Sequence, residues 1–189
     1  MGFFLTLVQV NRVGGSVVAN ALSSIHQLTP AEIGVVIGVM FLSSALVQIP
    51  FGIMLDRFGA RRMIVGWSSV AIIGTVIFGL AETSSGLTVG RTLIGIGHGA
   101  SITGVYLLAL AWASPERVAS VAATTIAVAG ALGGMIGTAP LAASIQYVGF
   151  TDTFLYLAVV SLLSSILIWF FVDDKPPGAR IENTKENSK

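Results

Sequence analysis

The chain contains no cysteine, only two histidines and few charged side chains. The lack of cysteine excludes disulfide bonds and thiol chemistry. Charged residues make up 10% of its 189 residues, whereas hydrophobic residues make up 54% and the mean hydropathy is +0.88. A soluble domain carries about 25% charged residues. The composition therefore indicates a protein whose surface faces lipid.

Six apolar stretches are long enough to span a membrane, for which a helix needs about 20 residues. The expected spans are residues 3–22, 31–55, 63–81, 87–111, 118–143 and 153–172. We expect each span to be a helix, because backbone groups in hydrocarbon must be hydrogen-bonded within their own segment. Residues 173–189 are polar and are expected to form a cytoplasmic tail or linker. The predicted fold class is an all-α integral membrane protein with six transmembrane helices.

The positive charges outside the spans fall on one side of the predicted membrane. The odd-numbered connections hold no Lys or Arg, whereas the even-numbered connections and the tail hold Arg57, Arg61, Arg62, Arg117, Lys175, Arg180, Lys185 and Lys189. The positive-inside rule then places both termini in the cytoplasm. We accordingly expect an inner-membrane protein of a bacterium.

Two connections carry signals for the start of a helix. Residues 29–32 (TPAE) have the form of a capping box with proline at the first helical position. Residues 114–116 (SPE) are expected to open the fifth span in a similar way. Further along that span, Pro140 is expected to kink the helix.

The connection between the second and third spans combines charge with glycine. Residues 52–62 read GIMLDRFGARR, which has the form G-x-x-x-D-R-x-G-x-R-R. This resembles the signature loop between helices 2 and 3 of the major facilitator superfamily of transporters. Residues 91–97 (RTLIGIG) resemble the R-x-x-x-G-x-G motif of helix 4 in that superfamily. The resemblance covers nearly the whole chain and is to the amino-terminal six-helix half of such a transporter.

This resemblance implies a fold and roles for the residues of the loop. In the family, each half is built from 3+3 inverted repeats. The gating-motif candidates are Gly52, Asp56, Arg57, Gly59, Arg61 and Arg62. The acid would act as a gate against a helix of the other half, and the two glycines would permit close packing and the turn. The three arginines would hold the loop at the cytoplasmic face, although positive-inside topology alone also explains them.

Polar side chains recur at helical spacing on the first and fourth spans. The cavity candidates are Gln9, Arg12, Ser16, Asn20, Arg91, His98 and Tyr106. At about 1.5 Å rise per residue, Arg12 lies about 14 Å from one end of its helix and His98 about 17 Å from the opposite end of its own. In a core about 30 Å thick, both lie near the midplane, where transporters of this type bind substrate.

The three ionisable candidates on the first and fourth spans, Arg12, Arg91 and His98, also have structural explanations. Arg12 and Arg91 could extend towards the lipid headgroups, and His98 could be a buried neutral histidine bonded to a neighbouring helix. The functional alternatives for His98 are contact with the substrate and a proton site. For Arg91 the resemblance implies a role in proton coupling or in organising the cavity. Gly95 and Gly97 could serve close helix packing. The resemblance also implies that the third and sixth spans face lipid, and these spans have no ionisable side chain within their apolar stretches apart from their ends.

The expected function is secondary active transport of a small anionic organic solute by alternating access, coupled to protons. The sequence shows no nucleotide-binding loop, no paired intramembrane carboxylates and no metal-ligand cluster. We therefore expect no enzyme activity, no cofactor, no metal and no nucleic-acid partner.

The expected partners are the lipid bilayer, the solute and a second six-helix half. Because family members have twelve helices, that half would come from the rest of a longer chain, from a separate chain or from a second copy. The alternative function is a non-transporting membrane scaffold or assembly partner with the same fold.

Overall fold

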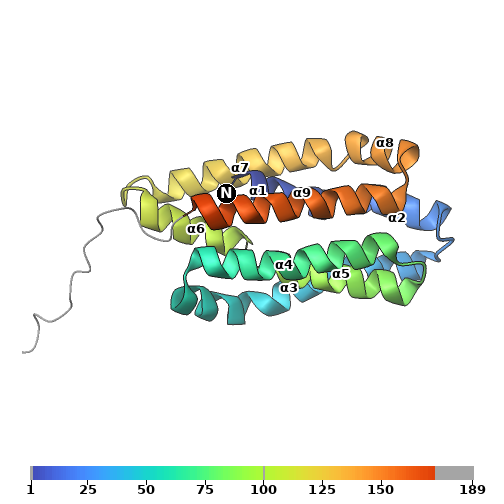
Figure 1. Ribbon diagram of the computed structural model, residues 1–189, viewed down its shortest axis with the longest axis horizontal. Helices are drawn as coiled ribbons and strands as arrows, with labels where there is room; N and C mark the ends of the chain where they lie inside the picture. Colours follow the sequence, from blue (N-terminus) through green and yellow to red (C-terminus); the bar gives the residue numbers. More distant parts are fainter. Residues whose placement is uncertain (1, 100, 173–189) are drawn as a thin grey trace, which may run out of the picture.

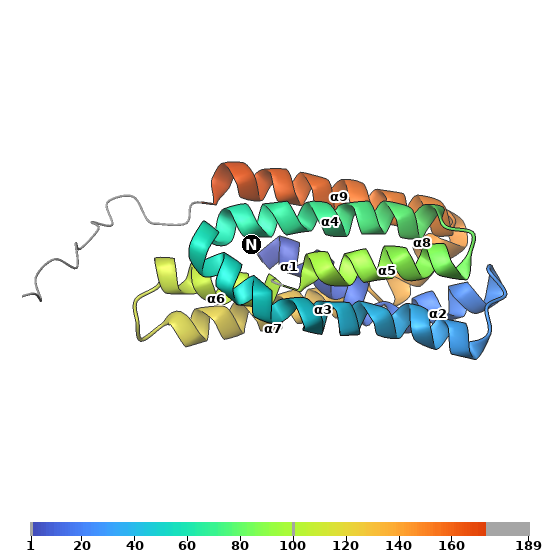
Figure 2. The ribbon, with the colours of Figure 1, turned by 90° about the horizontal axis from the view of Figure 1, so that it is seen from below.

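The computed structural model describes residues 2–99 and 101–172, with only the backbone described for Leu55, Asp56 and Ala60. Its helices are α1 (Gly2–Val13), α2 (Gly15–Ser24), α3 (Pro30–Phe58), α4 (Ala60–Leu80), α5 (Ser84–His98), α6 (Ser101–Trp112), α7 (Val118–Ile136), α8 (Ala139–Tyr147) and α9 (Phe150–Phe171). They run side by side along the long axis of the molecule (Figures 1 and 2). The described ranges hold no strand, so the predicted all-α class is confirmed.

Five helices or consecutive helix pairs are long and apolar enough to cross a membrane. A sixth span forms if α1 and α2, which meet at 47°, are taken as one bent helix. The first expected span is bent at Gly14, and in the fifth α7 ends at Ile136 and α8 begins at Ala139. In the fourth, α5 and α6 are separated by a residue outside the described part, and Ser84–Trp112 still qualifies as one span. The expectation that each span is one uninterrupted helix is therefore wrong for the first and fifth spans.

The break in the fifth span lies just before the expected kink at Pro140. α8 begins at Ala139, so Pro140 occupies one of the first helical positions. Proline has no N–H to donate to the carbonyl four residues earlier, which here is that of Ile136, the last residue of α7. The loss of this hydrogen bond accounts for the end of α7 at this point.

The capping box at the start of α3 is confirmed, whereas the similar start expected for α7 is wrong. The Thr29 N–H donates to Glu32 Oε2 at 2.9 Å, and the Glu32 N–H donates to Thr29 Oγ1 at 3.4 Å. Ser114 instead uses its carbonyl, which accepts hydrogen bonds from the N–H groups of Arg117 and Val118. Arg117 is the N-cap residue of α7, and no side chain caps that helix.

The main helix contacts run through α4 and α5 on one side of the bundle and through α1 and α7 on the other. α4 lies along α5 and α9, α3 packs against α5, and α1 packs against α7. α4 and α9 are joined by a hydrogen bond of 2.7 Å between the hydroxyls of Ser68 and Ser165. Most of α4 is covered, whereas α3, α7 and α9 each leave a broad apolar face exposed. The expected lipid-facing position thus suits the sixth span better than the third.

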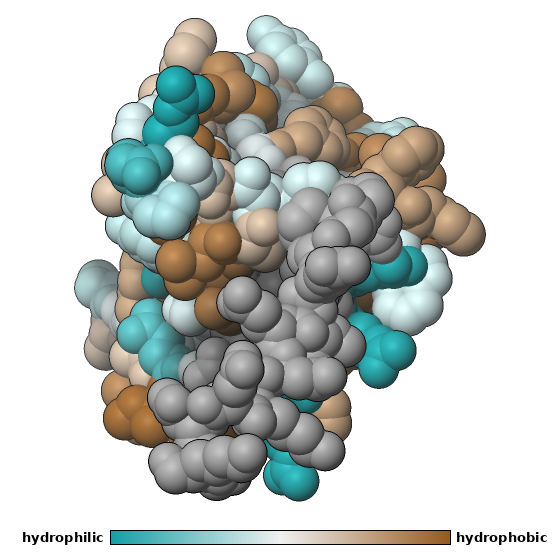
Figure 3. All heavy atoms as spheres, turned by 90° about the vertical axis from the view of Figure 1, so that its left-hand side faces the viewer, coloured by the Kyte–Doolittle hydropathy of each residue, from teal (hydrophilic) through white to brown (hydrophobic). Residues whose placement is uncertain are grey.

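The exposed arginines lie at one end of the bundle. Arg57 and Arg62 flank the α3–α4 turn, and Arg117 lies in the α6–α7 connection at the same end (Figures 1 and 2). Figure 3 shows this end, where hydrophilic side chains alternate with apolar ones. The bundle is therefore polarised along its long axis, as the charge pattern of the connections predicts.

Candidate functional site

The α3–α4 turn is made by Gly59. Its backbone has φ 84° and ψ 155°, a conformation that is open to glycine and strained for residues with a Cβ. Beside it, the guanidinium of Arg61 lies over the ring of Trp169 at 4.8 Å, which attaches the turn to the end of α9. The resemblance had implied close packing at Gly52, but a Cβ there would meet nothing within 4 Å. The side chain of Asp56, the expected gating acid, lies outside the described part of the structure.

Arg91 lies inside the bundle, with only 2% of its surface exposed. Its Nη1 donates a hydrogen bond to the Asn11 carbonyl at 3.2 Å and lies 3.4 Å from Met40 Sδ. Its guanidinium also lies 4.4 Å from the centre of the Phe78 ring. These partners come from α1, α3 and α4 and are uncharged. Arg91 therefore joins three helices instead of reaching towards headgroups.

The break in the first span supplies the acceptor for Arg91. α1 ends at Val13, so the Asn11 carbonyl lies in the last turn, where carbonyls lack an N–H donor further along the same helix. A cation at the C-terminal end of a helix is also favoured by the helix dipole. The buried charge of Arg91 thus caps the broken end of α1.

Arg12 and His98 lie near Arg91. His98, the last residue of α5, is buried with its ring edge-on to Phe4, at 6.5 Å between ring centres. Arg12 is half-buried, with its guanidinium 6.0 Å from the centre of the Phe41 ring. Arg91 lies seven residues before His98 on α5 and donates to the carbonyl of Asn11, the residue before Arg12. The three candidates therefore lie on two neighbouring helices, α1 and α5.

The other cavity candidates are dispersed by the helix breaks. Gln9 is half-buried and packs against Gly133 of α7, whereas Ser16 and Asn20 lie exposed on α2 beyond the bend at Gly14. Tyr106 is 43% exposed on α6, so it lies on a different helix from Arg91 and His98. A single continuous polar stripe along each span does not form.

Some residues of this region were not expected from the sequence. Asn20 lines a cavity of about 400 Å³ between α2 and α8 together with Ser24 and Gln146. Gln146 is the only amide in the run from residue 139 to residue 147, and that polar interruption was a usable signal. Asn11 and Met40 gave no such signal, because Arg91 contacts a backbone carbonyl of one and the sulfur of the other.

The described structure is that of a multi-spanning helical membrane protein with buried positive charge at broken helices. The chain belongs to the Major Facilitator Superfamily, whose family model matches residues 1–189. The amino-terminal half-fold implied by the loop and helix-4 motifs agrees with this match.

Three relatives illustrate the similarity. The chain is 31% identical over 157 residues to an uncharacterized transporter of Buchnera aphidicola subsp. Schizaphis graminum. The aligned stretch covers 82% of this chain and 39% of the relative. It is 34% identical over 97 residues to the inner membrane transport protein YajR of Escherichia coli. This match covers 51% of the chain and 20% of YajR. It is 28% identical over 170 residues to the probable sulfoacetate transporter SauU of Cupriavidus necator. This match covers 90% of the chain and 39% of SauU. The chain thus spans at most about two fifths of the length of these relatives.

Proposed function

We propose that this chain forms six helices of a secondary active transporter that moves a small anionic organic solute by alternating access. The observation that carries the proposal is the group of Arg12, Arg91 and His98 in the interior of the bundle. The partners that the structure gives both arginines are uncharged. Charged groups inside a membrane usually face a partner or a water-filled pathway. An anionic solute would supply the missing countercharge.

The three residues would have different tasks. Arg12 is half-buried, so its guanidinium remains reachable and would bind a carboxylate, phosphate or sulfonate with paired N–H donors. Arg91 is engaged with the end of α1, so it would fix the position of Arg12, the residue that follows Asn11. His98 would hold the transported proton or donate a hydrogen bond to the solute.

The proposed solute class is consistent with one relative. SauU is named as a probable sulfoacetate transporter, and sulfoacetate carries two anionic groups. An inner-membrane location is supported by the name of YajR, an inner membrane transport protein. The arginines at one end of the bundle support a cytoplasmic position for that end.

The proposal also requires a second six-helix half. α3 and α7 expose broad apolar faces, including Leu46, Ile49, Ile53 and Met135, and such faces mark contacts with lipid or protein. Rocking of two halves about a midplane site is how transporters of this architecture alternate access. The other half would be another part of a longer chain, a separate chain or a second copy.

The mass of the native species in mild detergent tests this requirement first. After subtraction of bound detergent, we expect a particle of at least twice the 19.6 kDa of the chain. A particle with the mass of one chain would contradict a dimeric or two-chain assembly. The chain would then transport only when the remaining half is supplied on the same polypeptide.

The anion proposal is tested by Arg12→Ala in proteoliposomes made from the assembled species. With labelled small carboxylates and sulfonates and an imposed pH gradient, we expect KM to rise about 10- to 100-fold, because a hydrogen bond to a charged group contributes about 1.5–3 kcal/mol. Arg12→Lys keeps the charge and retains part of the activity. Arg180→Ala removes an arginine from the polar segment after the last span and serves as the control. Uptake of a neutral solute with a KM that is unchanged in Arg12→Ala would contradict the proposal.

A further inference from the structure

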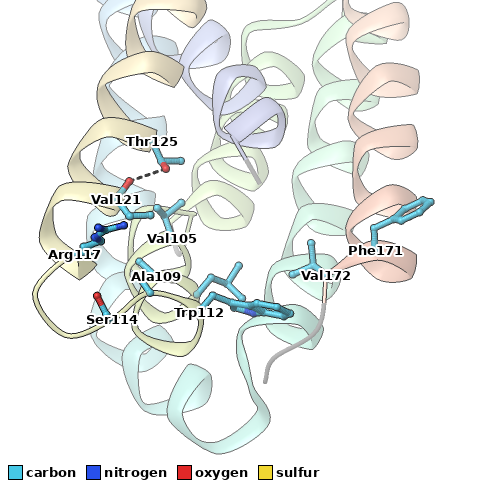
Figure 4. Close-up of a pocket in the computed structure, with 11 residues that line it drawn as sticks. Val105, Ala109, Trp112, Ser114, Arg117, Val121, Thr125, Phe171 and Val172 are labelled. Atoms are coloured by element: carbon cyan, nitrogen blue, oxygen red, sulfur yellow. Dashed lines mark hydrogen bonds between the residues drawn. The ribbon is translucent and has the colours of Figure 1, made fainter. Parts of the chain in front are cut away.

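A further cavity lies at the arginine-bearing end of the bundle, and none of Arg12, Arg91 and His98 lines it. It has a volume of about 710 Å³ and lies between α6, α7 and the end of α9 (Figure 4). Binding sites for small molecules have volumes of about 300–1,000 Å³. Its walls are mainly apolar, and its lining includes Trp112, Ser114, Arg117, Val121, Thr125 and Phe171.

The polar part of the cavity is concentrated at the start of α7. Arg117 is exposed, lines the cavity and is the N-cap residue of α7. No side chain caps this helix, so the amides of Ala119 and Ser120 lie in a first turn whose N–H groups have no acceptor within the helix. A helix N-terminus beside an arginine favours a phosphate group, through amide donors, the helix dipole and the guanidinium charge.

The apolar part continues along α7, away from Arg117. Thr125 lines both this cavity and a second one of about 620 Å³ between α1 and α7, which Val128 also lines. Val128 lies 11 residues after Arg117, or about 16 Å along the helix. This length is about half of a hydrocarbon core of about 30 Å. The surface therefore has the dimensions of one lipid molecule in one leaflet, with the charged end at Arg117.

We propose that this surface binds an anionic phospholipid, with its phosphate at Arg117 and the first turn of α7 and its acyl chain in the cavity beside Trp112. Trp112 and Phe171, which both line the cavity, are 52% and 80% exposed, and tryptophan is enriched at the headgroup level of membranes. The occupant is a lipid because the charge and the apolar walls meet at the depth where a headgroup meets its chains. The proposal is independent of the transported solute.

Fluorescence quenching by brominated lipids tests this proposal in the full chain. The chain contains three tryptophans, so Trp67→Phe with Trp169→Phe leaves Trp112 as the reporter. In bilayers with brominated acyl chains, we expect phosphatidylglycerol to quench Trp112 with about fivefold higher apparent affinity than phosphatidylcholine, a preference that one basic side chain near an anionic headgroup supplies. Equal quenching by the two lipids, or quenching by neither, would overturn the proposal.

Two variants and one control locate the site. Arg117→Ala is expected to bring the two lipids to equal affinity, whereas Arg62→Ala, which removes an exposed arginine from the same end of the bundle, is expected to keep the preference. Val121→Phe fills the cavity and is expected to reduce quenching by both lipids. The thermal midpoint of each variant in detergent shows that it is folded. A preference that survives Arg117→Ala, or quenching that survives Val121→Phe, would place the lipid elsewhere.

Discussion

Replacing Gly97 by alanine is expected to destabilise the protein by about 2–3 kcal/mol, the upper part of the range for overpacking a well-packed interior. A Cβ at Gly97 would contact the Ala71 backbone nitrogen, lie 2.5 Å from Ala71 Cβ and lie 2.6 Å from the Trp67 carbonyl oxygen. None of these atoms belongs to a side chain that can rotate away. α4 and α5 would have to separate, and α5 carries both Arg91 and His98.

Gly66→Ala is the matched control, because Gly66 also lies in α4, near the same contact in sequence. A Cβ at Gly66 would meet nothing within 4 Å, so the variant gains only the helix propensity of alanine, at most about 1 kcal/mol. Unfolding in mild detergent, followed by circular dichroism during heating or titration with a denaturing detergent, compares the two. If Gly97→Ala unfolds at the same point as the unsubstituted chain, α4 and α5 do not approach as closely as described.

Gly97 also shows how far the fold could be predicted from the sequence. The spacing of Gly95 and Gly97 indicated close helix packing, and the apolar stretches indicated six spans with boundaries within a few residues. The neighbours of Gly97 could not be predicted, because a small-residue pattern is compatible with any facing helix. The bend at Gly14 was likewise not predicted, since glycine bends a helix only where the surrounding packing favours the bend.

The sequence indicated how deep in the membrane the candidate residues lie, but not which way their side chains face. The positions of Arg12 and His98 along their spans indicated a common level near the midplane, whereas Arg91 lies four residues after the start of its expected span. Which of them faces open space depends on the neighbouring helices and on the bend of 47° between α1 and α2. For this reason Gln9 turns towards Gly133 while Ser16 and Asn20 are exposed. The partner of Arg91 was hidden because it is a backbone carbonyl, which every residue possesses.

Two substitutions of Arg91 are expected to have very different effects on stability. Arg91→Ala removes the hydrogen bond to the Asn11 carbonyl and leaves a cavity between Met40 and Phe78. Truncating a large buried side chain costs about 2–5 kcal/mol, and losing the charged hydrogen bond about 1.5–3. Arg91→Ala also removes two buried N–H groups, Nε and Nη2, that have no partner among the described residues. Removing each of them stabilises the folded state by about 1–3 kcal/mol. From the middle of each range, we expect a net loss of about 2 kcal/mol.

Arg91→Met keeps most of the volume, and it also removes a buried charge whose described partners are all neutral. Replacing buried charge by apolar side chains of similar size is often neutral or stabilising, so we expect a stability within about 1 kcal/mol of the unsubstituted chain or above it. Unfolding in detergent measures both variants, and the order Met above Ala is the result to check. Because the end of α1 loses its cap in both, both are expected to lose solute uptake in proteoliposomes. A methionine variant as unstable as the alanine variant would show that the hydrogen bond to Asn11, rather than the packing of the side chain, holds α1 to α5.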